Sequence, residues 1–183
     1  MNNIQNKEQT SLGDNDMRKI LPKAKILKYS ELAKYTDIHQ LIKKPKDYFI
    51  LLYEDSEVNG QACGHWSCLF KDLHNNIIFF ESYGGSPDTQ RKWVNQNQLN
   101  LLGESEPYLT NLLNNADEKI VFSSVKYQGN SQKISTCGRH VLNVLVNLLQ
   151  HNMNLEDYHI YMHTLKDKTN KDYDFIVTEL IPI

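Results

Sequence analysis

One stretch of the chain joins a polar loop to a strongly apolar segment: Tyr127-Gln-Gly-Asn-Ser-Gln-Lys-Ile-Ser-Thr-Cys-Gly-Arg-His-Val-Leu-Asn-Val-Leu-Val-Asn-Leu-Leu-Gln150. The loop has no helical period, whereas almost every residue from Val141 to Leu149 is apolar. A helix of that composition has no side that favours solvent. We therefore expect a buried helix that begins near Cys137, with Ser135 or Thr136 as its N-cap.

Cys137 would lie in the first turn of this helix. Unpaired backbone N–H groups and the helix dipole favour a negative charge there. A thiol in that position has a lowered pKa and is partly thiolate near neutral pH, as a nucleophile requires. The alternative interpretation is a small core residue at a helix start. The residues upstream favour the nucleophile.

Length and composition limit the classes of protein. The 183 residues are 40% hydrophobic and include ten Tyr, six Phe and two Trp, which suffices for one core and one domain. A net charge of -2 gives no general attraction to nucleic acid or to an anionic membrane. Three cysteines, an odd number, imply no disulfide framework. Since we find no apolar run typical of a signal peptide or membrane span, we expect a soluble, intracellular protein without membrane partners.

The chain divides into an arm and a domain. Residues 1–18 are polar, Asn-rich and aperiodic, and we expect them to be disordered or a flexible, loosely held arm. Residues 19–183 should form a single domain. Its strands are predicted at 47–53, 63–70, 77–82 and 119–127, the second and third as a hairpin.

Helices are predicted between these strands and after them. Ser30 and Thr36 should each start a short helix, and Ser86-Pro87-Asp88 should start one that carries Trp93. Further helices are expected at 99–102, 108–113, 155–165 with Asn154 as N-cap, and 172–180, where strand is the alternative. The pattern indicates an α+β fold.

The chemistry of a cysteine protease needs four parts, and the sequence offers each of them. A histidine takes the thiol proton, a carboxylate or amide orients that histidine, and N–H donors stabilise the oxyanion. His65 leads a predicted strand, Glu81 ends its neighbour, Gln128 follows a later strand, and Cys137 opens the buried helix. Strand ends and helix starts commonly meet at one edge of a sheet, so these side chains can converge.

Four motifs in this order resemble the adenain-like cysteine proteases of DNA viruses, whose superfamily includes the proteases of ubiquitin-like proteins. The motifs are His65-Trp66, Phe79-Phe80-Glu81-Ser82, Gln128-Gly129 and Thr136-Cys137-Gly138, within residues 45 to 180. Glu81 matches adenain's glutamate. The interval from Gln128 to Cys137 is about two residues longer than in adenain, which makes Gln132 a competing candidate. We prefer Gln128 because it ends a predicted strand.

The resemblance implies a fold and a role for each residue. The fold would be adenain-like: α+β, with a mixed, mainly antiparallel sheet of about five strands packed around the helix of the nucleophile. Cys137 would attack the scissile carbonyl, His65 would be the general base and acid, and Glu81 would orient the imidazole. The Gln128 amide and the Cys137 N–H would form the oxyanion hole. Trp66 and Gly138 would contact substrate, and the bulk of Trp66 favours a Gly-rich cleavage sequence.

Each residue also has a simpler interpretation. His65 and Trp66 could be core residues of a strand, Glu81 a solvated hairpin carboxylate, and the two glutamines ordinary loop amides. It is their combination that favours a catalytic site.

Zinc ligation by Cys63, His65 and Cys68 is disfavoured, because in one strand Cys68 faces away from the other two. No metal or other cofactor is therefore expected. His140 should be a surface or packing histidine rather than a second base. Arg139 could pair with a carboxylate or line the cleft.

Three functions remain open at this level. The favoured one is a thiol protease that processes capsid or core precursors during virion maturation, in a virophage, polinton-like element or large DNA virus. It would act in the virion, the host cytoplasm or a viral factory, as a monomer. Removal of ubiquitin-like modifiers is an alternative, and an inactive virion structural or binding module is another. The resemblance raises an activating peptide or DNA as partners, although the low net charge argues against strong DNA dependence.

Overall fold

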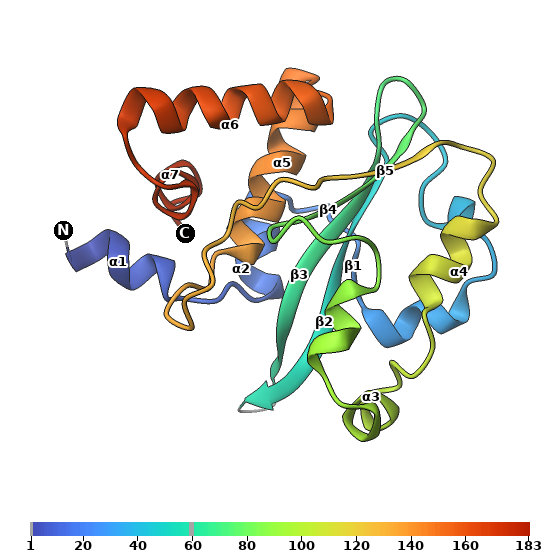
Figure 1. Ribbon diagram of the computed structural model, residues 1–183. Helices are drawn as coiled ribbons and strands as arrows, with labels where there is room; N and C mark the ends of the chain where they lie inside the picture. The colour runs from blue at the N-terminus through green and yellow to red at the C-terminus, as the bar shows by residue number, and fades with distance from the viewer. Residues whose placement is uncertain (1, 59–60) are drawn as a thin grey trace.

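The computed structural model describes residues 2–58 and 61–183, and it has an α+β fold. One twisted sheet runs through the molecule, with helices packed against both of its faces (Figure 1). Helices α2, α5, α6 and α7 lie on one side of the sheet, and α3 and α4 lie on the other (Figure 1). The α+β prediction is confirmed.

The sheet has five strands in the order β1-β2-β3-β4-β5. Their bounds are Ile26–Lys28, Tyr48–Val58, Gln61–Lys71, Ile77–Glu81 and Ile120–Phe122. The long pairings of β2 with β3 and of β3 with β4 are antiparallel, whereas the short pairings at both edges are parallel. The sheet is therefore mixed, and its antiparallel centre includes the predicted hairpin.

The sheet separates two apolar cores, which explains the nearly continuous hydrophobicity of its central strands. Residues that alternate along β2 and β3 face opposite sides. The core on the α5 side contains Ile50, Leu52, Trp66, Cys68, Phe70 and Phe80. The core on the other side contains Phe49, Leu51, Tyr53, Leu69 and Phe79. Both faces of the hairpin that carries His65 and Glu81 are thus held by packed side chains.

Helix α5, Cys137–His151, is the predicted buried helix, and eleven of its fifteen residues are buried. Thr136 occupies the N-cap position, but its hydroxyl makes no capping bond. It donates instead to the carboxylate of Asp174 in helix α7. The prediction of Ser135 or Thr136 as the N-cap residue is therefore confirmed for Thr136, although its hydroxyl donates to the charged Asp174 instead of accepting from the first turn of the helix.

Most other predicted helices are present. They are α3 (Gln96–Leu102), α4 (Tyr108–Asn114), α6 (Leu155–Thr169) and α7 (Tyr173–Leu180), together with the 3-10 helices η1 (Tyr29–Lys34), η2 (Ile38–Gln40) and η3 (Thr89–Trp93). Asn154 caps α6 as expected. Asp88 has a left-handed backbone with φ of 65°, so Ser86-Pro87-Asp88 precedes a 3-10 turn rather than starting an α-helix.

The predicted strand at 119–127 ends early, since β5 stops at Phe122. Beyond it the backbone is held by hydrogen bonds between loops. The N–H groups of Tyr127 and Gln128 both donate to the carbonyl of Ser82, at 2.8 and 2.9 Å. Gln128 therefore does not end a strand, but its backbone is fixed beside the end of β4.

The expected loose arm is instead two packed helices, α1 (Asn2–Glu8) and α2 (Asp14–Ile20). Leu12 and Met17 are buried in the α5-side core. The carbonyl of Glu8 accepts from Ser135 N–H at 2.7 Å. The polar composition concealed these few apolar contacts, and helices α1 and α2 pack against the rest of the domain.

None of the helices in residues 2–58 and 61–183 has the length and apolar character needed to cross a membrane.

Candidate active site

Cys137 is the first residue of α5 and is only 7% exposed. Its thiol shares a hydrogen bond with the His65 side chain and accepts from the backbone N–H groups of Trp66 and Gly138. Burial alone would raise its pKa, but the charge and hydrogen bond of His65 and these two N–H donors outweigh burial and lower it. The environment therefore favours the thiolate, the reactive form of cysteine.

His65 lies in β3, opposite Tyr53 of β2, and is 8% exposed. Its Nε2 lies 2.9 Å from Glu81 Oε2, which leaves Nδ1 as the ring nitrogen for Cys137. Burial acts to lower the His65 pKa, but the hydrogen bonds and negative charges of Cys137 and Glu81 raise it to about 9. An imidazolium is therefore stable at neutral pH between two anionic partners.

Glu81, the last residue of β4, is almost completely buried. Its Oε2 accepts from His65 and from Tyr83 N–H at 2.9 Å, and its Oε1 accepts from Gly85 N–H. Burial would raise the pKa of this carboxyl, but the bond and charge of His65 and the two N–H donors lower it overall. The solvated interpretation of Glu81 is wrong, since the carboxylate is fixed on one ring nitrogen.

Gly64 lets the strand before His65 approach β2 closely. A β-bulge shifts the register between Glu54 and Ser56 of β2 at this point. A Cβ at position 64 would lie 1.8 Å from the carbonyl oxygen of Tyr53, so any side chain would push the strands apart. Glycine here lets the bulge form and thereby sets the position of His65.

Gln128 is buried, whereas Gln132 is exposed. The Oε1 atom of Gln128 accepts from Ser82 Oγ at 2.7 Å, and its Nε2 donates to the carbonyl of Ile134 at 3.3 Å. Because the Ile134 carbonyl can only accept, its bond fixes which end of the amide is Nε2. One hydrogen of that NH₂ group remains available to another acceptor. Its role in an oxyanion hole stays a prediction.

Comparison with known proteins places the chain in a viral group. No family model matches the chain. The uncharacterized protein V9 of Sputnik virophage is 36% identical to it over 145 residues, which cover 79% of each chain. The chain belongs to the V9 family. The family supports a viral origin for this chain. The name of that relative states no activity, so the family gives no information about the chemistry of the site.

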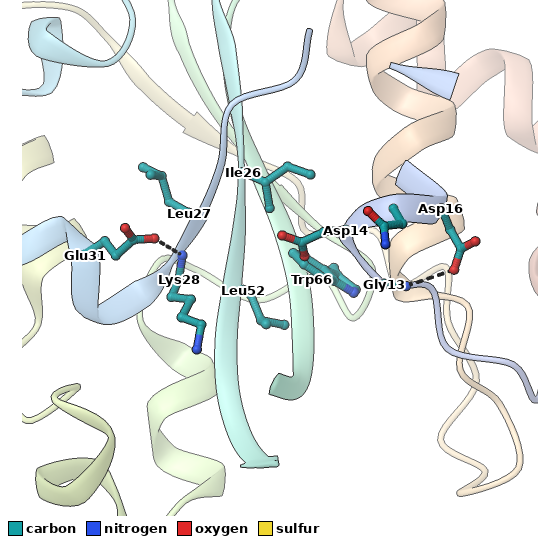
Figure 2. Close-up of a pocket in the computed structure, with 10 residues that line it drawn as sticks. Gly13, Asp14, Asp16, Ile26, Leu27, Lys28, Glu31, Leu52 and Trp66 are labelled. Carbon is teal, nitrogen blue, oxygen red and sulfur yellow. Dashed lines mark hydrogen bonds between the residues drawn. The ribbon is translucent and has the colours of Figure 1, made fainter. Parts of the chain in front are cut away.

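Trp66 in this V9-family chain is buried rather than open to solvent. Only 4% of it is exposed, and its Nε1 donates to the carbonyl of Leu12 at 2.9 Å. Its remaining surface lines a pocket of about 680 Å³ together with Leu52, Ile26 and the segment from Gly13 to Asp16. Figure 2 shows Asp14 and Trp66 between the start of α2 and the strands β1 and β2.

Gly138 is covered by the same N-terminal segment. A Cβ at this position would lie 2.9 Å from Met17 Cε and 3.3 Å from Trp66 Cδ1. In this conformation Gly138 faces packed side chains, so substrate contact would come through its backbone or after movement of the segment.

Two aromatic residues that the sequence pattern does not predict for the site enclose His65. Tyr83 stacks on the imidazole with centroids 5.2 Å apart, and Trp93 meets it edge-on at 5.2 Å. Trp93 is 54% exposed, unusual for such a large apolar residue. Both rings line an open cavity of about 490 Å³ with Lys126 and Asn130. The Gly84-Gly85 turn after β4 and a tryptophan in a polar segment are the sequence signals for this wall.

The remaining candidates also have clear positions. Arg139 is fully buried, and it donates to the carbonyls of Thr10 and Ile183 at 2.8 and 3.1 Å rather than pairing with a carboxylate or lining the cleft. His140 is also fully buried, so the packing interpretation holds and the surface one is wrong. Among the described residues, no three His, Cys, Asp or Glu side chains come together as a metal site.

Proposed function

We propose that this V9-family protein is a cysteine endopeptidase that cleaves capsid or core precursor proteins during virion maturation. The observation that carries the proposal is the hydrogen-bonded series Cys137, His65 and Glu81 at the start of a buried helix. It combines a thiol of lowered pKa with a histidine of raised pKa and a fixed carboxylate. A structural cysteine needs none of these features.

The first half of the reaction would form an acyl-enzyme. The Cys137 thiolate attacks the scissile carbonyl carbon, and the carbonyl electrons move to oxygen to give a tetrahedral oxyanion. The Gln128 amide and the Cys137 N–H would donate to this oxyanion. His65 then gives its proton to the leaving amine as the C–N bond breaks, which leaves a thioester and a neutral imidazole.

The second half would release the acid product. Neutral His65 takes a proton from water as the water oxygen attacks the thioester carbonyl. Collapse of the second oxyanion expels the thiolate, so the thiolate–imidazolium pair is restored. Glu81 remains ionised and holds the ring on Nε2 in both halves.

The surroundings of the pair favour a narrow substrate. Cys137 and His65 are 7% and 8% exposed, and Tyr83 and Trp93 flank the imidazole. A peptide with glycine at the scissile bond would place the least bulk between these walls. Gly-rich cleavage sequences fit this geometry, and the virophage origin of the relative fits a role in the virion or viral factory.

The direct test is cleavage of natural substrates. The purified protein is incubated with the capsid and core proteins encoded by the same virus, and new termini are read by mass spectrometry. We expect new termini after Gly-rich sequences, and none with Cys137→Ala. Cleavage that persists in Cys137→Ala would reject the proposal.

Alkylation provides a test that needs no substrate. Iodoacetamide at mildly acidic pH should modify Cys137 faster than the partly exposed Cys63 or the buried Cys68. His65→Ala should remove this preference. Equal, slow modification of all three thiols would favour an inactive module.

A further inference from the structure

A second buried carboxylate lies next to the site, and the proposed mechanism does not use it. Asp174 is in the first turn of α7 and is only 3% exposed. Its Oδ2 accepts from Gly129 N–H at 2.8 Å. Its Oδ1 accepts from the hydroxyl of Thr136 and lies 3.2 Å from His140 Nε2. All of these donors belong to the loop before α5 or to its first turn.

Two of the donors are direct neighbours of proposed catalytic residues. Gly129 follows Gln128, and Thr136 precedes Cys137. The loop between them is solvent-exposed at Asn130, Ser131, Gln132 and Lys133. One carboxylate therefore joins both ends of an otherwise exposed loop, and it fixes the spacing between the side chain and the N–H that would bind the oxyanion.

We propose, on the basis of the protease function proposed above, that Asp174 is a positioning residue for the oxyanion hole. It holds Gly129 and Thr136 so that the Gln128 amide and the Cys137 N–H point to the same place before substrate binds. A donor displaced by a fraction of an ångström loses much of its effect on the transition state. Asp174 does not touch the reacting atoms, and it acts through the loop.

The charge of Asp174 is part of this arrangement. Burial would raise its pKa, but the bonds from His140, Thr136 and Gly129 lower it, so the group is a carboxylate. Burial lowers the pKa of His140 more than Asp174 raises it, so His140 is a neutral donor. An ionised acceptor with several donors gives strong, short hydrogen bonds, which a neutral amide would not reproduce.

Two reagents separate this role from a general structural one. A peptide aldehyde forms a tetrahedral adduct with Cys137 and needs the oxyanion hole, whereas iodoacetamide alkylates the thiolate without it. For Asp174→Asn we expect kcat to fall by about 10- to 100-fold with KM within about threefold of the wild type. Aldehyde affinity should weaken in parallel with kcat, and the alkylation rate of Cys137 should stay unchanged.

Thr136→Val is the second variant, because it removes one donor and leaves the carboxylate in place. It should show the same pattern with a smaller effect, which keeps the test available if Asp174→Asn does not fold. Unchanged aldehyde affinity, or an equal loss of alkylation, would overturn the inference. A wild-type protein that neither cleaves peptides nor binds the aldehyde would instead reject the proposed protease function itself.

Discussion

Among the described residues, two buried histidine–carboxylate pairs lie near Cys137, and the pKa values of their histidines shift in opposite directions. His65 lies 2.9 Å from Glu81, and its pKa is raised to about 9. His140 lies 3.2 Å from Asp174, and its pKa is lowered. Both histidines are buried, and both accompanying carboxylates have lowered pKa values.

The difference between the two pKa values arises at the second ring nitrogen of each histidine, the one that does not face the carboxylate. His65 uses it for the Cys137 thiol, so the imidazolium has an anion on each side. The Nδ1 of His140 has no hydrogen-bond partner among the described residues, and one carboxylate shared with two other donors does not offset burial. Of these two buried histidines, the one with a negative group at each ring nitrogen has the raised pKa.

The largest loss of activity should come from removing the Cys137 thiolate. This thiolate is the group that His65 has beside it and His140 lacks. Cys137→Ala should lower peptide cleavage by at least ~10⁴-fold, because the nucleophile is lost. It should also lower the pKa of His65 toward that of His140, which a histidine NMR titration can follow. Circular dichroism should show an intact fold, since Cys137 opens α5 without capping it. An unchanged His65 pKa would contradict the two-anion explanation.

The next largest effect should come from replacing His65, and a substitution of His140 serves for comparison. His65→Ala should lower kcat/KM by ~10³- to 10⁴-fold, because no group remains to protonate the leaving amine. His140→Gln is the matched control, since glutamine can still donate to Asp174 and should stay within about tenfold of the wild type. Both are measured on one peptide substrate. Equal losses would mean that the second pair also takes part in proton transfer.

The two glutamines test whether the loop held by Asp174 carries the oxyanion donor. Gln128→Ala should lower kcat by ~10²-fold or more with little change in KM, because the contact forms mainly in the transition state. Gln132→Ala should stay within a few-fold, since that side chain is exposed. The assignment must be reversed if the two variants show the opposite order.

The smallest effect concerns the charge of Glu81. Glu81→Gln should keep measurable activity, because an amide oxygen can still hold His65 Nε2. The wild-type imidazolium is lost as pH rises through about 9, and removing the carboxylate removes one cause of that raised pKa. The alkaline limb of kcat/KM should therefore move to lower pH. A limb at the wild-type position would assign the raised pKa to Cys137 alone.

The sequence allowed prediction of the parts that depend on local pattern. The β3–β4 hairpin brings His65 and Glu81 together across sixteen residues, and a continuous apolar run identified the helix of Cys137. Turn chemistry and period-two strands carry such information without knowledge of the rest of the fold.

Long-range contacts could not be read in the same way. Asp174 lies 38 residues beyond Thr136, in a segment whose pattern was ambiguous between helix and strand. Only the docking of α7 gives it a role. The packing of residues 2–18 was not predicted for the same reason, because it rests on Leu12, Met17 and a few bonds to backbone carbonyls rather than on periodicity.

The contacts of Arg139 bear on the order in which the site assembles during folding. This one side chain joins Thr10, 129 positions before it, to Ile183, 44 positions after it. Contacts of such separation form late, whereas a hairpin forms early. We expect the His65–Glu81 pair to assemble first, and Cys137 to dock only after the segments that contain Thr10 and Ile183 have both packed against Arg139. Alkylation of Cys137 that develops in step with the final refolding phase, rather than with hairpin formation, is the observation to seek.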